Sequence, residues 1–73
     1  MTTIASRIMD LVKSVRRDEY NFGVLSTGEQ IAVALVLNRA DMLTPHGTIL
    51  EAIDRLGRPW SEAALQVQRE IVL

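Results

Sequence analysis

Few side chains in this sequence could do chemistry, and the first of them is His46. It is the one residue that ordinarily titrates near neutral pH, so a general acid-base mechanism would depend on it. The chain has no cysteine to act with it as a nucleophile. A serine triad has no fixed spacing in sequence, but 73 residues leave little material for a pocket around one. We therefore predict no enzyme activity and no catalytic residue, with His46 at the surface or in a helix cap.

Glu51 and Asp54 form the second candidate group, because they lie three residues apart on a predicted helix. Paired carboxylates can bind a metal ion. Arg55 and Arg58 follow closely, however, so we expect ion pairs on a solvated helix face instead. Zinc would need thiolate or imidazole ligands, and the chain offers only His46. We predict no metal site, no cofactor and no small-molecule ligand.

The string LSTGEQIAVAL, residues 25–35, resembles the signature segment of ATP-binding-cassette ATPases, roughly LSGGEQ followed by VAL. The resemblance implies that Ser26 and Gly28, at a helix N-terminus, contact the γ-phosphate of an ATP held mainly by the opposing subunit. Thr27 replaces one of the two central glycines, and the chain has neither a GxxxxGKS loop nor an acidic magnesium-binding strand. Without those parts no nucleotide could be positioned for hydrolysis. We interpret the match as a shared helix-capping pattern.

Length and composition predict one small domain over residues 1–73, because two cores would each be too small to be stable. Hydrophobic residues make up 48% of the chain, which is rich for a domain with so much surface per volume. No cysteine is present to form a stabilising disulfide. Apolar surface left over after folding would be buried against a second copy or another protein, so we expect a homodimer or a protein partner.

The charge balance argues against a polyanionic partner. Eight Lys and Arg stand against nine Asp and Glu, giving a formal net charge of −1 and no global field to attract nucleic acid. The N-terminus lacks the pattern of a signal peptide, and the longest apolar run, residues 31–37, is far short of the ~20 residues that span a bilayer. We predict a cytoplasmic protein with no membrane contact.

The apolar spacing predicts an all-α fold, a small four-helix bundle or orthogonal helical array. The expected helices cover about residues 3–17, 27–40, 45–56 and 59–72. The first begins at a Thr2 or Thr3 cap, carries basic residues in its last turns and ends at Asp18 to Gly23, where Tyr20 and Phe22 should pin the connection onto the core. Its core stripe is Ile4, Ile8, Leu11, Val12 and Val15.

The second predicted helix contains the apolar run IAVALVL, residues 31–37. Ser26 with Glu29, or Thr27 with Gln30, satisfies the spacing of a capping box before it. Such a run could also be a buried strand, but the cap and the lack of a second strand to pair with it favour a helix. A helix that is apolar on every side should be the central element of the fold.

The third predicted helix opens at Thr44-Pro45, and Gly57 with Pro59 separates it from the fourth. The expected core stripe of the third helix is Ile49, Leu50, Ile53 and Leu56. In the fourth helix the shared apolar face is Trp60, Ala63, Ala64, Val67 and Ile71.

These features predict a small helical protein-protein interaction or accessory protein that self-associates or binds a protein partner. Five apolar residues off the main core stripes are the candidates for the interaction surface. They are Met9, Tyr20, Phe22, Met42 and Leu65.

A helix-turn-helix protein that binds DNA and regulates transcription is the alternative. ILEAIDRL, GRP and WSEAALQVQ would supply a helix, a three-residue turn containing Gly57 and a recognition helix, over about residues 49–70. Gln66, Gln68 and Arg69 could contact base edges or phosphate. Acidic side chains on both helices argue against this alternative.

Overall fold

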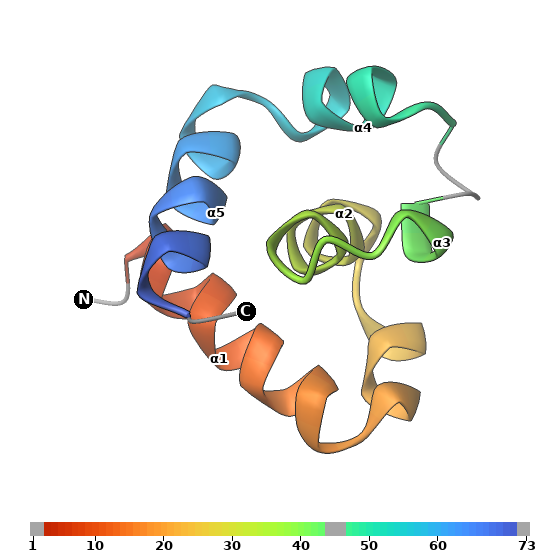
Figure 1. The fold of residues 1–73 in the computed structure, drawn as a ribbon, viewed down its shortest axis with the longest axis vertical. Helices are drawn as coiled ribbons and strands as arrows, with labels where there is room; N and C mark the ends of the chain where they lie inside the picture. Colours follow the sequence, from red (N-terminus) through yellow and green to blue (C-terminus); the bar gives the residue numbers. More distant parts are fainter. Residues whose placement is uncertain (1–2, 44–46, 72–73) are drawn as a thin grey trace.

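The computed structural model describes residues 3–43 and 47–71, and this part of the chain folds as helices with no strand. The all-α prediction is confirmed. Helix α2 is seen end-on at the centre of Figure 1, and the other elements surround it. The elements are α1 (Ile4–Arg17), the 3-10 helix η1 (Glu19–Val24), α2 (Thr27–Val36), α3 (Ala40–Leu43), α4 (Ile49–Leu56) and α5 (Arg58–Glu70).

The central helix α2 provides most of the core. Ile31, Ala32, Val33 and Ala34 are consecutive and completely buried, and Val36 is 1% exposed. Four consecutive buried residues point in every direction around a helix, so α2 must have neighbours on all sides. Helices α1, α3, α4 and α5 all pack against it. The prediction of a central helix is confirmed, and the strand alternative for residues 31–37 is wrong.

Helix α1 is amphipathic as predicted. Ile8, Val12 and Val15 are buried against α2 and α5. The hydroxyl of Thr3 caps the helix by accepting a hydrogen bond from the backbone N–H of Ser6 at 3.0 Å. The cap occupies one of the first N–H groups of α1, which have no partner within the helix.

The connection after α1 is the short helix η1. Asp18 caps it by accepting a hydrogen bond from the Tyr20 backbone N–H at 3.0 Å. Phe22 packs against the core as predicted. The same prediction for Tyr20 is wrong, because that side chain is 82% exposed. With three residues per turn, positions 20 and 22 point to different sides, so only one aromatic ring can face the core.

The predicted helix over residues 27–40 ends earlier than expected, at Val36. Asn38 takes a left-handed conformation with φ of 55°, which an α-helix does not allow. Its N–H donates to the Leu35 carbonyl at 3.2 Å, and the Arg39 N–H donates to the Ala34 carbonyl at 2.9 Å. These two bonds make a Schellman cap, in which asparagine replaces the more common glycine. The chain then turns into α3.

The predicted start of the third helix is also wrong. Thr44 and Pro45 lie outside the described residues, but Gly47 has φ of 90° and Thr48 is extended, so α4 begins at Ile49. The Thr48 hydroxyl accepts from the Glu51 N–H at 3.1 Å, and the Glu51 carboxylate accepts from the Thr48 N–H at 3.3 Å. This reciprocal capping box sets the start of α4.

Only Gly57 separates α4 from α5. Its φ of 83° and ψ of 163° form a conformation that side chains other than that of glycine rarely adopt. Arg58 and Pro59 already belong to the first turn of α5, so the three-residue turn predicted from GRP is wrong. Pro59 fits there because the first N–H groups of a helix have no partner within it.

Helix α5 lies beside α1, and both helices pack against the central helix α2 (Figure 1). Ala63, Ala64 and Val67 are buried, and Trp60 and Ile71 are partly buried against them, so the predicted apolar face is confirmed. Gln68 holds α5 to the end of α2 by donating to the carbonyls of residues 35 and 36 at 3.1 and 3.2 Å.

Candidate interaction surface

Large apolar side chains stay exposed together on α4 and α5. The exposed fraction is 79% for Leu50, 52% for Ile49, 46% for Leu65 and 39% for Ile53. Partly buried Leu35 of α2 connects them, because it lines one hollow with Ile53 and Leu65 and a second hollow with Ile49. Leu50 and Ile53 are neighbours at a spacing of three on α4. We call these five residues the α4–α5 surface.

This arrangement corrects the predicted core stripe of the third helix. Of that stripe only Leu56 is buried, together with Ala52, which the prediction omitted. Ala52 and Leu56 lie on the side of α4 that packs against α2. Ile49 and Leu50 are consecutive and so point about 100° apart around the helix axis. Packing one side of α4 against α2 therefore cannot bury both side chains. The apolar residues of α4 therefore cover a wider part of the helix surface than the side that packs against the rest of the chain.

The larger hollow in the α4–α5 surface lies between α2, α4 and α5 and has a volume of about 220 Å³. Ser61, Ala64 and Gln68 line its α5 wall together with Leu65. The side-chain NH2 group of Gln68 donates to the carbonyls at the end of α2 and is therefore already hydrogen-bonded. The hollow therefore offers mainly apolar contact. The second hollow, on the α3 side of Leu35, is smaller, at about 50 Å³.

Opposite charges border the two sides of the α4–α5 surface. Asp54 follows Leu50 by one helical turn on α4, and Arg69 follows Leu65 by one turn on α5. Neither charge has an ion-pair partner among the described residues. Glu51 serves as a cap, and Arg58 pairs with Glu62 at 3.2 Å. The ion-pair network expected among residues 51, 54, 55 and 58 is therefore absent from the described part of the chain.

The five predicted interaction residues are distributed over four elements and do not form one patch. Met9 of α1, Phe22 of η1 and Met42 of α3 are partly buried and pack against the core. Tyr20 and Leu65 are exposed, on η1 and α5 respectively. Leu65 alone belongs to the α4–α5 surface.

The sequence prediction missed Ile49, Leu50 and Ile53, and it also missed Val24 of η1, which is 77% exposed. One signal was present in the sequence. Consecutive large apolar residues such as Ile49 and Leu50, in a helix of eight residues, indicate an apolar arc too wide for one packing contact.

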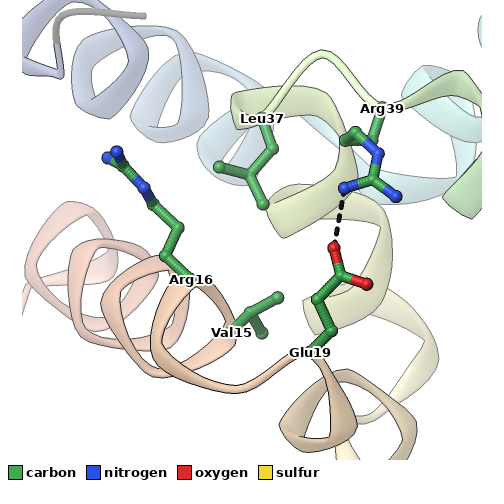
Figure 2. Close-up of a pocket in the computed structure, with 5 residues that line it drawn as sticks. All are labelled: Val15, Arg16, Glu19, Leu37 and Arg39. Atoms are coloured by element: carbon green, nitrogen blue, oxygen red, sulfur yellow. Dashed lines mark hydrogen bonds and ion pairs between the residues drawn. The ribbon is translucent and has the colours of Figure 1, made fainter.

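A second hollowed region lies between α1, η1 and the turn after α2, with a volume of about 270 Å³. The side chains of Val15 and Leu37 point toward each other, between Arg16 on one side and the Glu19–Arg39 pair on the other (Figure 2). Arg39 donates to Glu19 at 2.9 Å and makes two bonds to Asp41.

The bonds from Arg39 pair it with the carboxylates of Glu19 and Asp41, while Arg16 on the other side of the hollow has no ion-pair partner among the described residues. The side-chain hydrogen bond from Arg39 is the main reason that the pKa of Asp41 lies below the ordinary value. Conversely, the bonds to Asp41 and then Glu19 raise the pKa of Arg39, which stays positively charged at any physiological pH. The residues that line the hollow include no histidine, cysteine, serine or lysine.

The N-terminus of α2, where the ATPase-like string lies, is occupied by the protein's own carboxylate. Ser26 and Glu29 form a capping box, with the Glu29 N–H donating to the Ser26 hydroxyl at 3.3 Å and the Ser26 N–H donating to Glu29 at 3.0 Å. Arg7 donates to the other carboxylate oxygen of Glu29 at 2.7 Å. The position that a phosphate would take at this helix end is therefore filled. The match in sequence corresponds to a helix cap.

Among the described residues, no group of three or more His, Cys, Asp or Glu side chains is placed to hold a metal ion. His46, the one candidate acid-base residue, lies outside the described residues. None of the described helices combines the length and apolar character needed to cross a membrane.

The helix-turn-helix pattern is not reproduced in its expected form. The segment has two helices, but Gly57 alone joins them. Gln68, expected to contact bases, is turned inward and bonded to the end of α2. Gln66 and Arg69 are exposed.

No known family model matches the chain, and no curated protein or solved structure is detectably similar to it.

Proposed function

We propose that this chain is a small helical interaction protein that binds another protein chain through the α4–α5 surface. The observation that carries the proposal is the grouping of exposed Ile49, Ile53 and Leu65 around Leu35, with exposed Leu50 beside Ile53 on α4. Single exposed apolar residues are normal on a protein surface, but a connected group of this kind is typical of a contact site.

The shape of the surface favours a protein partner over a small molecule. Pockets for small ligands typically enclose about 300–1,000 Å³ and bury most of the ligand. The two hollows here measure about 220 and 50 Å³ and open at the surface. They can receive individual side chains of a partner, while Leu50 and Leu65 on either side supply the flanking contact.

Affinity capture with matched variants tests this function. Leu50→Lys and Leu65→Lys place a charge in the α4–α5 surface, whereas Val24→Lys places the same charge on η1, on the other side of α2 in Figure 1. We expect the wild-type chain and Val24→Lys to retain the same proteins, second copies of the chain included, and both leucine variants to lose them. If recovery is the same with all four chains, the proposed surface is wrong.

Heparin chromatography tests nucleic-acid binding, which is the alternative function. We expect the chain to pass through a heparin column at physiological salt. Retention that falls steeply as salt rises would favour the nucleic-acid alternative instead. The cytoplasmic location stays a prediction from the sequence.

A further inference from the structure

We infer that the α4–α5 surface binds the α4–α5 surface of a second copy of this chain, in a two-fold dimer in which α4 of each copy lies against α5 of the other. The inference rests on the proposed function and names its partner.

The apolar part of the surface can fill its own hollow. In a two-fold interface, residue i of one copy contacts residue j of the other, and residue j contacts residue i in return. Leu50 is the most exposed of the five residues and projects from α4, while the hollow of about 220 Å³ lies between Ile53 and Leu65. If one copy inserts its Leu50 beside Leu65 of the second copy, the two-fold symmetry also places Leu50 of the second copy beside Leu65 of the first.

The charges on the two sides of the surface favour the same arrangement. Asp54 lies one turn after Leu50 on α4 and Arg69 one turn after Leu65 on α5, and neither has an ion-pair partner among the described residues. Placing α4 of each copy against α5 of the other brings Asp54 toward the partner's Arg69, twice over by symmetry. The remaining pair on the α5 side, Arg58 and Glu62, is already neutral at 3.2 Å. A surface of one sign would repel its own copy, and this surface carries one charge of each sign.

Sedimentation analysis over a range of protein concentrations tests the dimer. We expect a monomer-dimer equilibrium for the wild-type chain and an increase of about 30-fold in the dissociation constant for Leu50→Lys and for Leu65→Lys, as for central interface residues. Val24→Lys should match the wild type. Circular dichroism and thermal unfolding establish that each variant is folded. Leu50→Ser, which adds no charge, serves if Leu50→Lys does not fold.

A charge exchange tests the orientation of the two copies. Asp54→Arg and Arg69→Asp should each raise the dissociation constant about tenfold, because each places like charges together at two symmetric positions. The double variant should return to within about threefold of the wild type. Neither side chain makes an ion pair with a described residue of its own chain, so the exchange removes no such contact within the monomer.

Three results would overturn the inference. The first is a wild-type chain that stays monomeric at every concentration. The second is a dimer with the same dissociation constant in both leucine variants, and the third is a double charge variant weaker than either single one. A monomeric chain that captures a different protein, and loses it on Leu50→Lys, would overturn the second copy as partner while supporting the proposed function. A chain that binds neither would overturn both.

Discussion

Arg7 of α1 donates two hydrogen bonds to one carboxylate oxygen of Glu29 of α2, from Nε at 3.2 Å and from Nη2 at 2.7 Å. The other oxygen of Glu29 accepts from the Ser26 backbone N–H. One carboxylate thus caps α2 and ties its start to α1. The hydrogen bond from the Ser26 backbone, followed by that from Arg7, holds the pKa of Glu29 below its ordinary value.

The lowered pKa of Glu29 predicts a pH dependence of stability. A carboxyl group whose pKa is lower in the folded than in the unfolded state stabilises the fold above the unfolded pKa, and this contribution is lost as the pH falls through the folded pKa. Glu29→Gln should therefore reduce the free energy of unfolding by about 0.5–1 kcal/mol at pH 7, and by less at about pH 3, because the contribution of the wild-type carboxylate decreases as the pH falls. Urea denaturation at several pH values measures this difference.

Asp10→Asn is the control for Glu29→Gln, because Asp10 is exposed on α1 and makes no ion pair with a described residue. Its effect on stability should not change with pH in the same way. A Glu29→Gln deficit that is equal at pH 7 and pH 3 would show that the charge of Glu29 does not stabilise the fold.

The cap of α2 can be tested at two adjacent residues. Ser26→Ala removes the hydroxyl that accepts from the Glu29 N–H and should lower the free energy of unfolding by about 1 kcal/mol. Thr27→Ala changes the first residue of the helix, whose side chain is exposed, and should leave stability within about 0.5 kcal/mol. Chemical denaturation of both variants measures the two effects. Equal effects would mean that Ser26 is not the cap.

Gly57 and Gly23 provide a matched pair for backbone strain. An added Cβ would meet no atom within 4 Å at either position, but only Gly57 has positive φ, at 83°. Gly57→Ala should therefore destabilise the fold by about 1–2 kcal/mol through strain alone. Gly23→Ala should be neutral or slightly stabilising. Thermal unfolding of the two variants compares them, and a harmless Gly57→Ala would contradict the described connection between α4 and α5.

The difference in burial between α2 and α4 predicts different costs for the same substitution. Ile31 is completely buried, so Ile31→Val should lower the free energy of unfolding by about 1 kcal/mol. Ile49 is 52% exposed, so Ile49→Val should change it by less than about 0.5 kcal/mol. Urea denaturation at a concentration that keeps the chain monomeric measures both. A larger cost at Ile49 would mean that α4 packs more deeply than described.

The sequence predicts those parts of this fold that depend on local spacing. The stripe of α1, the capping pattern before α2 and the apolar face of α5 all follow from residues within one or two turns of each other. The end of α2 and the start of α4 differ from the predicted bounds, and each lies next to a residue with positive φ, Asn38 and Gly47 respectively. Asparagine tolerates that conformation without requiring it, so its presence in a helical pattern did not reveal the end of α2.

The α4–α5 surface was harder to predict because it depends on which edge of α4 faces α2. Ile49, Leu50 and Ile53 have the spacing of a core stripe, and periodicity gives the same result for a buried stripe and for a contact surface. In the structure the side of α4 that carries the small residue Ala52 is the one buried, and α4 packs against α2. Composition predicted leftover apolar surface, but only the structure locates it.

The packing of α5 against α1 affects how the chain can fold during synthesis. These are the first and last helices of the described chain, and α5 also covers α2. While α5 is still within the ribosome, α1 and α2 can pack against each other but lack the contacts that both make with α5 in the folded chain. A nascent chain therefore cannot complete its core one helix at a time. Its core is complete only after α5 has emerged.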